Sequence, residues 1–323
     1  MWRRMRSLAM VTALALAPVA SAQTYPDRQI TIVVPAAPGG VTDLLGRALA
    51  KRFILAWGHD AIVENKPGAN NQIAAELVTK AAPDGYTLLI GPEATFVVNP
   101  FLYAKLPYEP IKGFSPISGL VSIHHALIVN PALPVKNVAD LLALGKQKPG
   151  ALNYGTFGVG STGHLNMEVF ERDAGIRLVP VHYKGATPAL TDVMAGHIQL
   201  MFISVGSAVP QAKAGKVRMI AIGAPERLAG LPDVPTVAES GVPGFEAVSW
   251  FGLYGPAGMP PAVVEKINGE VRKLFADTEF EKTFMAPQFF ESIAGSPAEL
   301  SAHLESDSAK WEKVIRDANI KMQ

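Results

Sequence analysis

The chain has 323 residues, of which 49% are hydrophobic and 18% are charged, and it contains no cysteine. This composition excludes a disordered or fibrous protein and is sufficient for one large domain or two of ordinary size. The lack of cysteine excludes disulfides, thiolate nucleophiles and sulfur-based metal sites, and a formal net charge of +1 without a basic block predicts no nucleic-acid partner.

The first 22 residues have the pattern of a secretory signal peptide. Three arginines within the first six residues precede the apolar stretch 8–20, and Ala20-Ser21-Ala22 forms a small-x-small cleavage site. The apolar stretch is interrupted by Pro18 and is shorter than the roughly 20 residues that a membrane span needs. We therefore expect a mature chain that begins at Gln23 and functions outside the cytoplasm. It carries 26 Lys and Arg against 28 Asp and Glu, a net charge of −2.

From Gln29 onward, short β-branched runs alternate with longer amphipathic segments, which is typical of an α/β fold with largely parallel strands. In chain order, strands are expected at 30–35, 61–65, 86–91, 125–130, 152–155, 178–183, 198–204, 217–223 and 248–256. Helices are expected at 41–53, 71–82, 137–147, 163–173, 187–196, 262–276 and 297–317. The proline- and glycine-rich section 224–261 predicts a long irregular crossing that contains only the strand at 248–256.

Two strand-loop-helix units stand at corresponding places in the two halves of this pattern. They are "IVVPAAPGGVTDLL" (32–45) and "LNYGTFGVGSTGHLNM" (152–167). Each places small residues between the end of a strand and the first turn of a helix, where backbone N–H groups lack partners and the helix dipole is positive. Each unit is a candidate anion-binding site, or anion seat. Their repetition predicts two lobes whose strand ends face one cleft.

The second seat also resembles two nucleotide-binding motifs. Residues 158–163 fit the G-x-G-x-x-G pattern, and 155–162 fit a phosphate loop except that Ser161 replaces its lysine. The next strand ends in Tyr183 and Lys184, where a dinucleotide site needs an acidic residue. We therefore expect neither ATP nor NAD, but a small anion held by the loop and by the hydroxyls of Ser161 and Thr162.

Catalytic and metal-binding patterns are weak. The sequence has no G-x-S-x-G elbow, and His164 and Glu168 form an i, i+4 pair without a third metal ligand nearby. We expect no cofactor and no metal. An exported hydrolase or lyase that uses Asp43, Glu93 or His164 as acid-base groups is the alternative that the residues leave open.

Six segments, taken in order, resemble the Bug-type periplasmic solute receptors, which are the extracytoplasmic binding proteins of tripartite tricarboxylate transporters. The resemblance covers essentially the whole mature chain. The segments are "VVPAAPGGVTDLLGRALA" (33–50), "VENKPGANNQIAAELVTKAAPDGYTLLIG" (63–91), "LPYEPIKGFSPIS" (106–118), "VHYKGATPALTDVMAGHI" (181–198), "LPDVPTVAESGVPGFEAVSWFGLYGPAG" (231–258) and "AKWEKVI" (309–315).

The resemblance implies a two-lobed α/β fold of the type II, Venus-flytrap class, with a central ligand cleft and two crossing strands. Lobe 1 would comprise residues 23–124 and 245–323, and lobe 2 residues 125–244. The protein would be a monomeric periplasmic receptor without cofactor or catalysis. It would capture a small carboxylate, such as a di- or tricarboxylate or an aromatic acid, and deliver it to the membrane subunits of a tripartite transporter. A receptor of this fold that only signals to a membrane partner would have the same sequence features.

The family's ligand contacts can be carried over residue by residue. In the first lobe they fall at Pro38, Gly39, Gly40 and Thr42, with Asp43 beside them, and at Asn70 and Asn71. In the second lobe they fall at Gly160, Ser161, Thr162 and His164, with Tyr183 and Lys184 close by.

Three departures from the family pattern modify this expectation. Ala36 and Val41 stand where the family commonly has phenylalanine and glycine, which predicts a roomier wall. Asn70 and Asn71 replace small residues and add amide groups. Ser204 replaces a common aspartate, so a ligand without an amine is expected.

Overall fold

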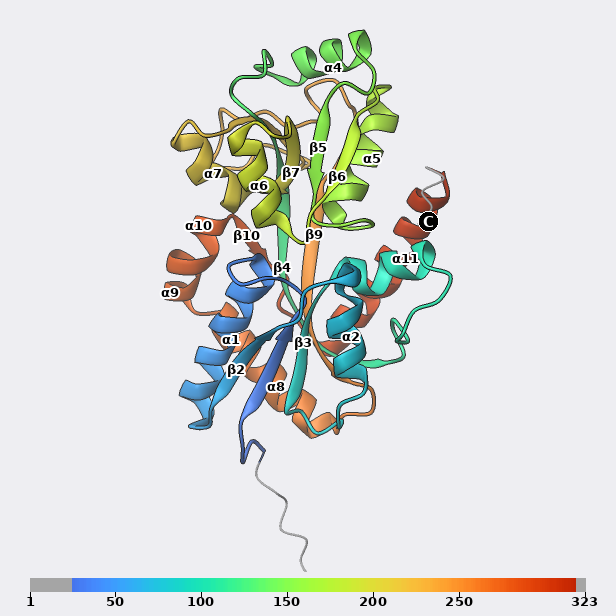
Figure 1. The fold of residues 1–323 in the computed structure, drawn as a ribbon. Helices are drawn as coiled ribbons and strands as arrows, with labels where there is room; N and C mark the ends of the chain where they lie inside the picture. Colours follow the sequence, from blue (N-terminus) through green and yellow to red (C-terminus); the bar gives the residue numbers. More distant parts are fainter. Residues whose placement is uncertain (1–24, 318–323) are drawn as a thin grey trace, which may run out of the picture.

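The computed structural model describes residues 25–317, which form two lobes joined by long strands (Figure 1). The expected signal peptide, residues 1–22, lies outside the described residues. The strands that the structure describes are β1 (Ile30–Val34), β2 (Ala61–Asn65), β3 (Thr87–Pro92), β4 (Phe114–Val129), β5 (Asn153–Thr156), β6 (Val179–His182), β7 (Leu200–Ser204), β8 (Arg218–Ile222), β9 (Val248–Pro256) and β10 (Phe290–Ser292). Their order is β2-β1-β3-β9-β4-β7-β5-β6, and β8 and β10 also pair with β4.

The helices surround this sheet in both lobes. The α-helices are α1 (Val41–Trp57), α2 (Gln72–Thr79), α3 (Asn99–Leu102), α4 (Val138–Gln147), α5 (Thr162–Ala174), α6 (Ala186–Ala195), α7 (Val205–Lys213), α8 (Pro261–Phe275), α9 (Thr278–Phe280), α10 (Ala286–Gln288) and α11 (Pro297–Asp317). The shorter helical turns are η1 (Ala69–Asn71), η2 (Ala94–Val98) and η3 (Glu281–Met285). The α/β class predicted from the alternating pattern is confirmed.

Two adjacent segments of chain cross between the lobes. Strand β4 pairs with β9 and β10 up to His124 and with β7 and β8 from His125 onward, so one strand belongs to both lobes. Beside it, the His125 N–H donates to the Ala247 carbonyl at 2.9 Å, just before β9 begins. The expected pair of crossing strands is therefore present.

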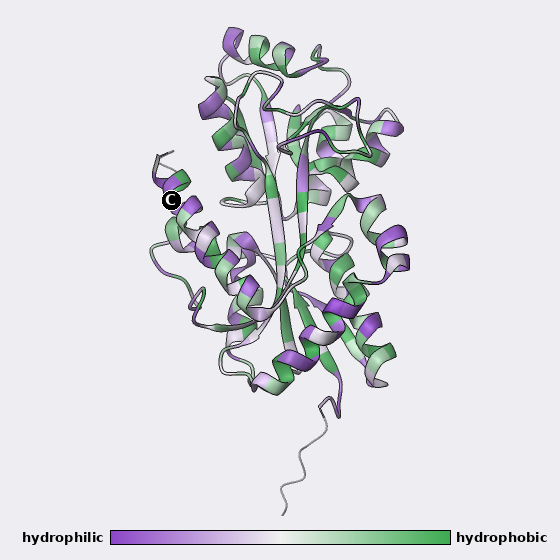
Figure 2. Ribbon diagram, turned by 180° about the vertical axis from the view of Figure 1, so that it is seen from behind, coloured by the Kyte–Doolittle hydropathy of each residue, from purple (hydrophilic) through white to green (hydrophobic). Residues whose placement is uncertain are grey.

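The first lobe contains β1 to β3, and its central strand is buried on both faces. Ile30, Ile32, Val33 and Val34 of β1 are each at most 1% exposed, as expected for a parallel strand covered by helices. Helix α1 contributes the buried residues Leu45, Leu49 and Phe53 to the same core. Figure 2 shows mainly hydrophobic residues along the strands at the centre of this lobe and a mixture of hydrophilic and hydrophobic residues on the helices around them.

The second lobe contains β5 to β8 and has an aromatic core. Tyr154, Phe170, Phe202 and Phe245 are fully buried, and the Phe202 and Phe245 rings stack with centroids 5.4 Å apart. Strand β5 lies between β6 and β7 and is parallel to both. This lobe thus repeats the plan of the first, with helices packed around a small parallel sheet.

The carboxyl ends of the parallel strands meet between the lobes. Strand β1 leads into the loop before α1, and β5 leads into the glycine-rich loop before α5. Strands β3, β6 and β7 end near the same place, because residues that follow each of them line one shared cavity. Ligands in open α/β sheets bind at such strand ends.

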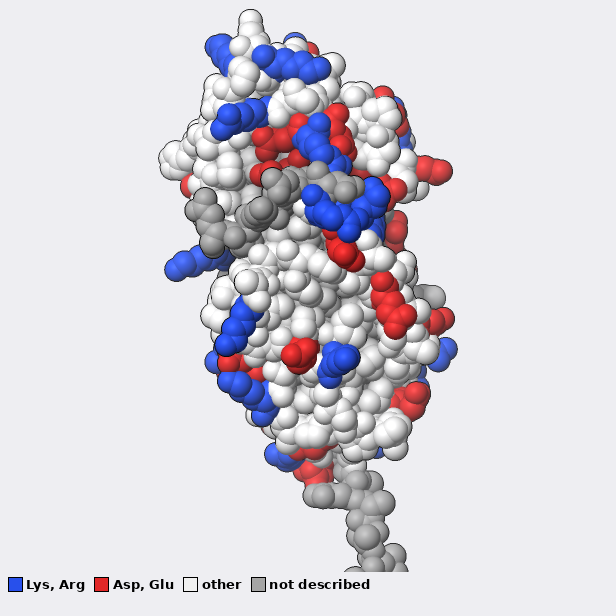
Figure 3. Space-filling view, turned by 90° about the vertical axis from the view of Figure 1, so that its right-hand side faces the viewer, with Lys and Arg blue, Asp and Glu red and all other residues white. Residues whose placement is uncertain are grey.

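The helices and one face of the molecule show how apolar and charged residues are distributed. Within residues 25–317, no helix has both the length and the apolar character needed to cross a bilayer. On the face shown in Figure 3, basic and acidic side chains are interspersed and are not gathered by sign.

Gly223 lies where the chain crosses between the lobes, and we expect its replacement to be destabilising. A Cβ atom at this position would lie 2.4 Å from the Ala247 Cβ and 2.7 Å from its backbone nitrogen. We predict that Gly223→Ala lowers the free energy of unfolding by about 1–3 kcal/mol, measured by urea denaturation. Gly269→Ala in α8 is the control, because its Cβ would enter open space and alanine favours the helix. Equal stability of the two variants would contradict the close approach of Gly223 to Ala247.

Candidate functional site

A cavity of about 480 Å³ lies between the two lobes. The first lobe contributes Pro35, Ala36, Val41, Thr42, Pro67, Gly68, Ala69, Asn70, Asn71, Pro92, Glu93, Ala94 and Tyr103. The crossing strands contribute Ile123, His125, Ser249 and Phe251. The second lobe contributes Phe157, Gly158, Val159, Ser161, Thr162, His182, Tyr183, Lys184, Gly185, Ala186, Ile203, Ser204 and Ser207.

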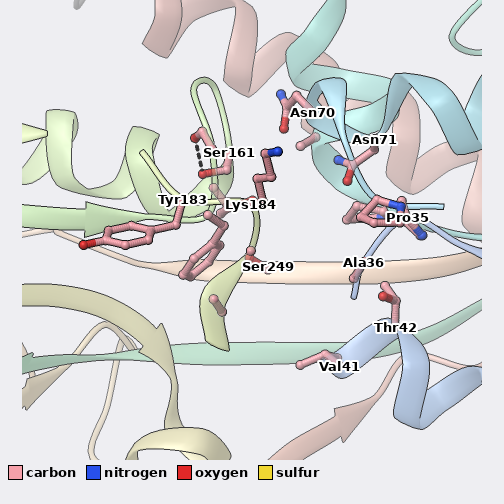
Figure 4. A pocket seen from close by; sticks show the side chains of 18 of the residues that line it. Pro35, Ala36, Val41, Thr42, Asn70, Asn71, Ser161, Tyr183, Lys184 and Ser249 are labelled. Carbon is pink, nitrogen blue, oxygen red and sulfur yellow. Dashed lines mark hydrogen bonds between the residues drawn. The ribbon is translucent and has the colours of Figure 1, made fainter. Parts of the chain in front are cut away.

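Thr42 presents an unpartnered hydroxyl in the wall of this cavity (Figure 4). It is 4% exposed, and its Oγ1 has no hydrogen-bond partner. Thr42 is the second residue of α1, which follows Gly40 without a side-chain cap. The first-turn N–H groups of a helix carry partial positive charge, so the hydroxyl and these amides form a donor-rich surface suited to an anion.

Asp43 shapes this wall from behind and does not line the cavity. Its carboxylate accepts hydrogen bonds from the Gly39 N–H at 3.0 Å, from Asn65 Nδ2 at 3.0 Å and from Arg47 Nε at 2.9 Å. Burial alone would raise the pKa of Asp43, but the hydrogen bonds, that from Arg47 first among them, hold it below its usual value. Asp43 therefore stays ionised and fixes the loop before α1.

The neighbouring wall, η1, has an uncommon backbone. Ala69, Asn70 and Asn71 have φ values of 47°, 47° and 71°, a left-handed region that non-glycine residues rarely enter. Asn99 holds this conformation, because Asn70 Nδ2 donates to Asn99 Oδ1 at 2.6 Å and Asn99 Nδ2 donates to the Asn70 carbonyl at 2.9 Å. Asn70 Nδ2 also donates to the Gly160 carbonyl of the opposite lobe at 3.1 Å.

The glycine-rich loop of the second lobe is held by its own side chains. Ser161 is the N-cap of α5, and its Oγ donates to the Gly158 carbonyl at 2.7 Å. The Gly160 N–H donates to His164 Nδ1 at 3.1 Å. His164 is thereby turned away from the cavity, and its Nε2 lies 3.4 Å from Glu168 Oε1. This imidazole supports the loop.

Tyr183 and Lys184 follow β6 and form the outer part of the second wall. The Tyr183 hydroxyl donates to Asp192 Oδ2 at 2.6 Å, and burial followed by this bond raises its pKa to about 12. The hydroxyl therefore points away, and its ring faces the cavity (Figure 4). Lys184 is exposed and is the only lysine or arginine among the described residues that line the cavity.

The two histidines in the lining provide little positive charge. His125 is buried, and this burial together with nearby His124 lowers its pKa to about 3, so its ring is neutral. His125 Nε2 lies 2.9 Å from Ser249 Oγ. The pKa of His182 is lowered by desolvation and then by His164. Positive charge in the cavity therefore comes from Lys184.

Glu93 is the one carboxyl group among the described lining residues, and it is 1% exposed. Its Oε1 accepts a hydrogen bond of 2.5 Å from Thr162 Oγ1 of the opposite lobe, and its Oε2 accepts one of 3.2 Å from the Trp250 N–H. Burial raises its pKa to about 7, against the lowering effect of the Thr162 hydrogen bond, and nearby Asp307 contributes to the rise.

This raised pKa predicts a pH-dependent stability. Between the usual pKa of 4.5 and about 7, native Glu93 keeps a proton that the unfolded chain has lost, so stability falls as pH rises through this range. The loss is on the order of 3 kcal/mol for a shift of this size. Urea unfolding at pH 5 and pH 8 should show a fall in stability that is larger by this amount in the wild type than in Glu93→Gln. The same difference between the two pH values in both proteins would contradict it.

Comparison with known proteins identifies the family of this chain. The family model described as "Tripartite tricarboxylate transporter family receptor" matches residues 45–320. The chain is 35% identical over 314 residues to a UPF0065 protein of Bordetella bronchiseptica, and the match covers 97% of this chain and 92% of that protein. The chain belongs to the tripartite tricarboxylate transporter receptor family.

Solved structures agree with this assignment to the Bug-type receptors. The structure of "R. palustris Rpa4515 with adipate" is similar with a TM-score of 0.89 and 35% identity, covering 92% of this chain and all of that one. The periplasmic binding protein BugD is similar with a TM-score of 0.87 and 32% identity, again over 92% of this chain and all of that one. The family is one of transporter receptors and BugD is a periplasmic binding protein, so this Bug-type receptor is not the hydrolase or lyase that the sequence left open.

The structure brings most of the expected contact residues of this receptor to one cavity. Eight of them line it: Thr42, Asn70, Asn71, Ser161, Thr162, Tyr183, Lys184 and Ser204. The other six do not: Pro38, Gly39, Gly40, Asp43, Gly160 and His164. Those six lie in or beside the two loops, where hydrogen bonds such as Asp43 to Gly39 and Gly160 to His164 fix the backbone.

Several lining residues were missed by the sequence reasoning. Phe157, Ile203 and Phe251 provide apolar surface, and His125 and Ser249 provide a neutral hydrogen-bonded pair from the crossing strands. These residues lie within or close to expected strands. Nothing in the sequence indicated that the two crossing segments would face the cavity.

Proposed function

We propose that this receptor captures a small carboxylate without an amine and delivers it to the membrane subunits of a tripartite tricarboxylate transporter. The observation that carries the proposal is the Thr42 hydroxyl, buried without a partner at the N-terminus of α1 in the wall of the cavity. An anion there gains hydrogen bonds from groups that otherwise have none. Lys184 of the opposite lobe contributes a positive charge to the same cavity.

An amine-free ligand fits the polar groups of this cavity. Ser204, which stands where an aspartate is common in the family, donates its hydroxyl hydrogen bond to Ser207 at 2.8 Å. The described lining offers no other carboxylate than Glu93, which already accepts hydrogen bonds from Thr162 and Trp250. A ligand ammonium group would therefore find no free partner of opposite charge.

Capture by closure of the lobes is part of the proposal. Among residues 25–317, two hydrogen bonds join the lobes across the cavity: Asn70 to the Gly160 carbonyl and Thr162 to Glu93. The lobes are connected by the two crossing strands, which suit a hinge. A ligand that contacts both walls would shift the population toward this closed arrangement.

The remaining expectations belong to the same proposal. We propose a monomeric periplasmic protein with a cleaved signal peptide, in line with its similarity to the periplasmic binding protein BugD. We also propose residues 23–124 and 245–323 as lobe 1 and residues 125–244 as lobe 2. The separate hydrophobic cores on either side of His124–His125 support the first boundary. Phe245 and Ala247 pack in the core of lobe 2, which favours a second boundary nearer the start of β9.

Thermal unfolding of the purified protein against a panel of ligands tests the proposed function. The panel contains mono-, di- and tricarboxylates, aromatic acids, amino acids and nucleotides. A ligand at 100 times its dissociation constant stabilises the native state by about 2.7 kcal/mol, which raises Tm by several degrees. We expect amine-free carboxylates to produce this shift. A response to nucleotides or amino acids alone would refute the proposal.

Thr42→Val tests the observation that carries the proposal. Valine keeps the shape of threonine and removes the hydroxyl, so we expect carboxylate affinity to fall about tenfold with no loss of stability. Thr95→Val is the matched control, because Thr95 is 1% exposed, also has an unpartnered Oγ1, and does not line the cavity. Calorimetric titration of both variants measures the effect. Equal affinities in the two variants would remove the Thr42 hydroxyl from the site.

A further inference from the structure

Glu93 places a carboxylate of the protein itself at the second anion seat. Thr162, which donates its hydroxyl to Glu93 Oε1, is the first residue of α5, and Ser161 is the N-cap of that helix. Glu93 comes from the opposite lobe, at the end of β3, so the contact spans the cavity. In this closed arrangement the Thr162 hydroxyl, which is expected to bind a ligand carboxylate, already donates its hydrogen bond to Glu93.

A second carboxylate on the ligand would meet two obstacles at this seat. It would compete with Glu93 for the Thr162 hydroxyl, and it would lie close to the buried carboxyl group of Glu93. Like charges placed together at an interface strongly disfavour binding. The first seat has no such occupant, because the Thr42 hydroxyl has no partner.

The charges of the lining support the same conclusion. Among the described lining residues, Lys184 is the one lysine or arginine and Glu93 the one carboxyl group. The buried ring of His125 is neutral. Above pH 7, where Glu93 is ionised, the cavity therefore brings one positive and one negative group, and each ligand carboxylate adds a further negative charge. One carboxylate leaves an excess of one negative charge, and two leave an excess of two.

The rest of the wall suits an apolar ligand body. Ile123 and Phe251 come from the crossing strands, and Phe157, Ile203 and the ring of Tyr183 come from the second lobe. The Tyr183 hydroxyl is engaged by Asp192 outside the cavity, so only its ring is offered to a ligand. Such a surface stabilises hydrocarbon or aromatic groups by removing them from water.

We propose that the receptor selects ligands with one carboxylate and an apolar body, and that Glu93 is the specificity-determining residue that excludes a second carboxylate. This inference rests on the proposed function. The ligand carboxylate lies at the N-terminus of α1, and the apolar body extends toward the second lobe. Glu93 keeps the second seat closed to anions when the lobes meet.

Matched ligands test the selection in the wild-type protein. Hexanoate, adipate and 6-aminohexanoate share one carbon chain and differ at one end, and benzoate and terephthalate form a second, rigid pair. At pH 8, where Glu93 is ionised, calorimetric titration should show each monocarboxylate binding at least about tenfold tighter than its dicarboxylate partner. Equal or tighter binding of the dicarboxylates would overturn the inference. Tighter binding of 6-aminohexanoate would also overturn it, because Glu93 would then recognise an ammonium group.

Glu93→Gln isolates the role of the charge. We expect the preference for hexanoate over adipate to shrink about tenfold in this variant, while Glu64→Gln, which removes a carboxylate outside the cavity, leaves the preference unchanged. An unchanged preference in Glu93→Gln would overturn the inference. If this variant does not fold, the comparison of mono- and dicarboxylate binding to the wild-type protein still tests the inference. Failure of every carboxylate to bind the wild type would instead refute the proposed function.

Discussion

Reversal of the charge at Lys184 is expected to produce the largest loss of ligand affinity. Lys184 is the only lysine or arginine in the described lining, and Glu93 already contributes a negative charge there. Lys184→Glu would leave the cavity without positive charge, so carboxylate affinity should fall more than about 100-fold. Lys184→Met, which keeps the length of the side chain, should lose about tenfold.

The stability of these Lys184 variants should be close to that of the wild type. Lys184 is exposed and forms no ion pair within residues 25–317, so its replacement breaks no contact of that kind. Lys148→Glu, an exposed site at the end of α4 and outside the cavity, is the control for the change in net charge. Calorimetric titration with one carboxylate compares all four proteins. Wild-type affinity in Lys184→Glu would exclude this lysine from the site.

Ser161→Asp is expected to weaken carboxylate binding by more than about 30-fold. Ser161 is 7% exposed, lines the cavity and is the N-cap of α5. Aspartate is a good N-cap, so the helix should be retained, while a second negative charge joins that of Glu93. Both charges would then repel a ligand anion.

The control for this substitution is Ser161→Asn. Asparagine has nearly the shape of aspartate and also caps helices, but it is neutral, so its effect on affinity should be much smaller. Thermal unfolding checks that both variants fold, and titration measures their affinities. Similar affinities in the Asp and Asn variants would show that the electrostatic character of this seat does not govern binding.

The sequence predicted the alternating architecture well because its signals are local. The run 30–34 is a continuous stretch of strand-forming residues, and 248–254 is rich in aromatic and aliphatic residues; the structure places β1 and β9 there. Segments without such a signal were missed. Helix α7 contains an internal proline, η2 is a π-helical turn, and the first part of β4, from Phe114, contains Pro116, Gly119 and two irregularities in its pairing.

The candidate site could be predicted only where it depends on strand-to-helix loops. Ser161 was found because it stands beside a helix N-terminus that follows a strand. Thr42 stands in the corresponding loop of the first lobe, where the resemblance to the family implied a contact. The hydrogen bond between Glu93 and Thr162 joins residues 69 positions apart and depends on how the lobes meet. The left-handed backbone of Asn70 depends on Asn99 in another segment. Such contacts are properties of the assembled fold.

The most direct test of this account is a crystal structure of the receptor with the acid that gives the largest thermal shift. We predict that the ligand lies in the cavity between the lobes, with one carboxylate oxygen within hydrogen-bond distance of Thr42 Oγ1 at the N-terminus of α1. Glu93 should still accept the hydrogen bond from Thr162. An acid bound outside the cavity, or within it but away from the α1 N-terminus, would contradict the account.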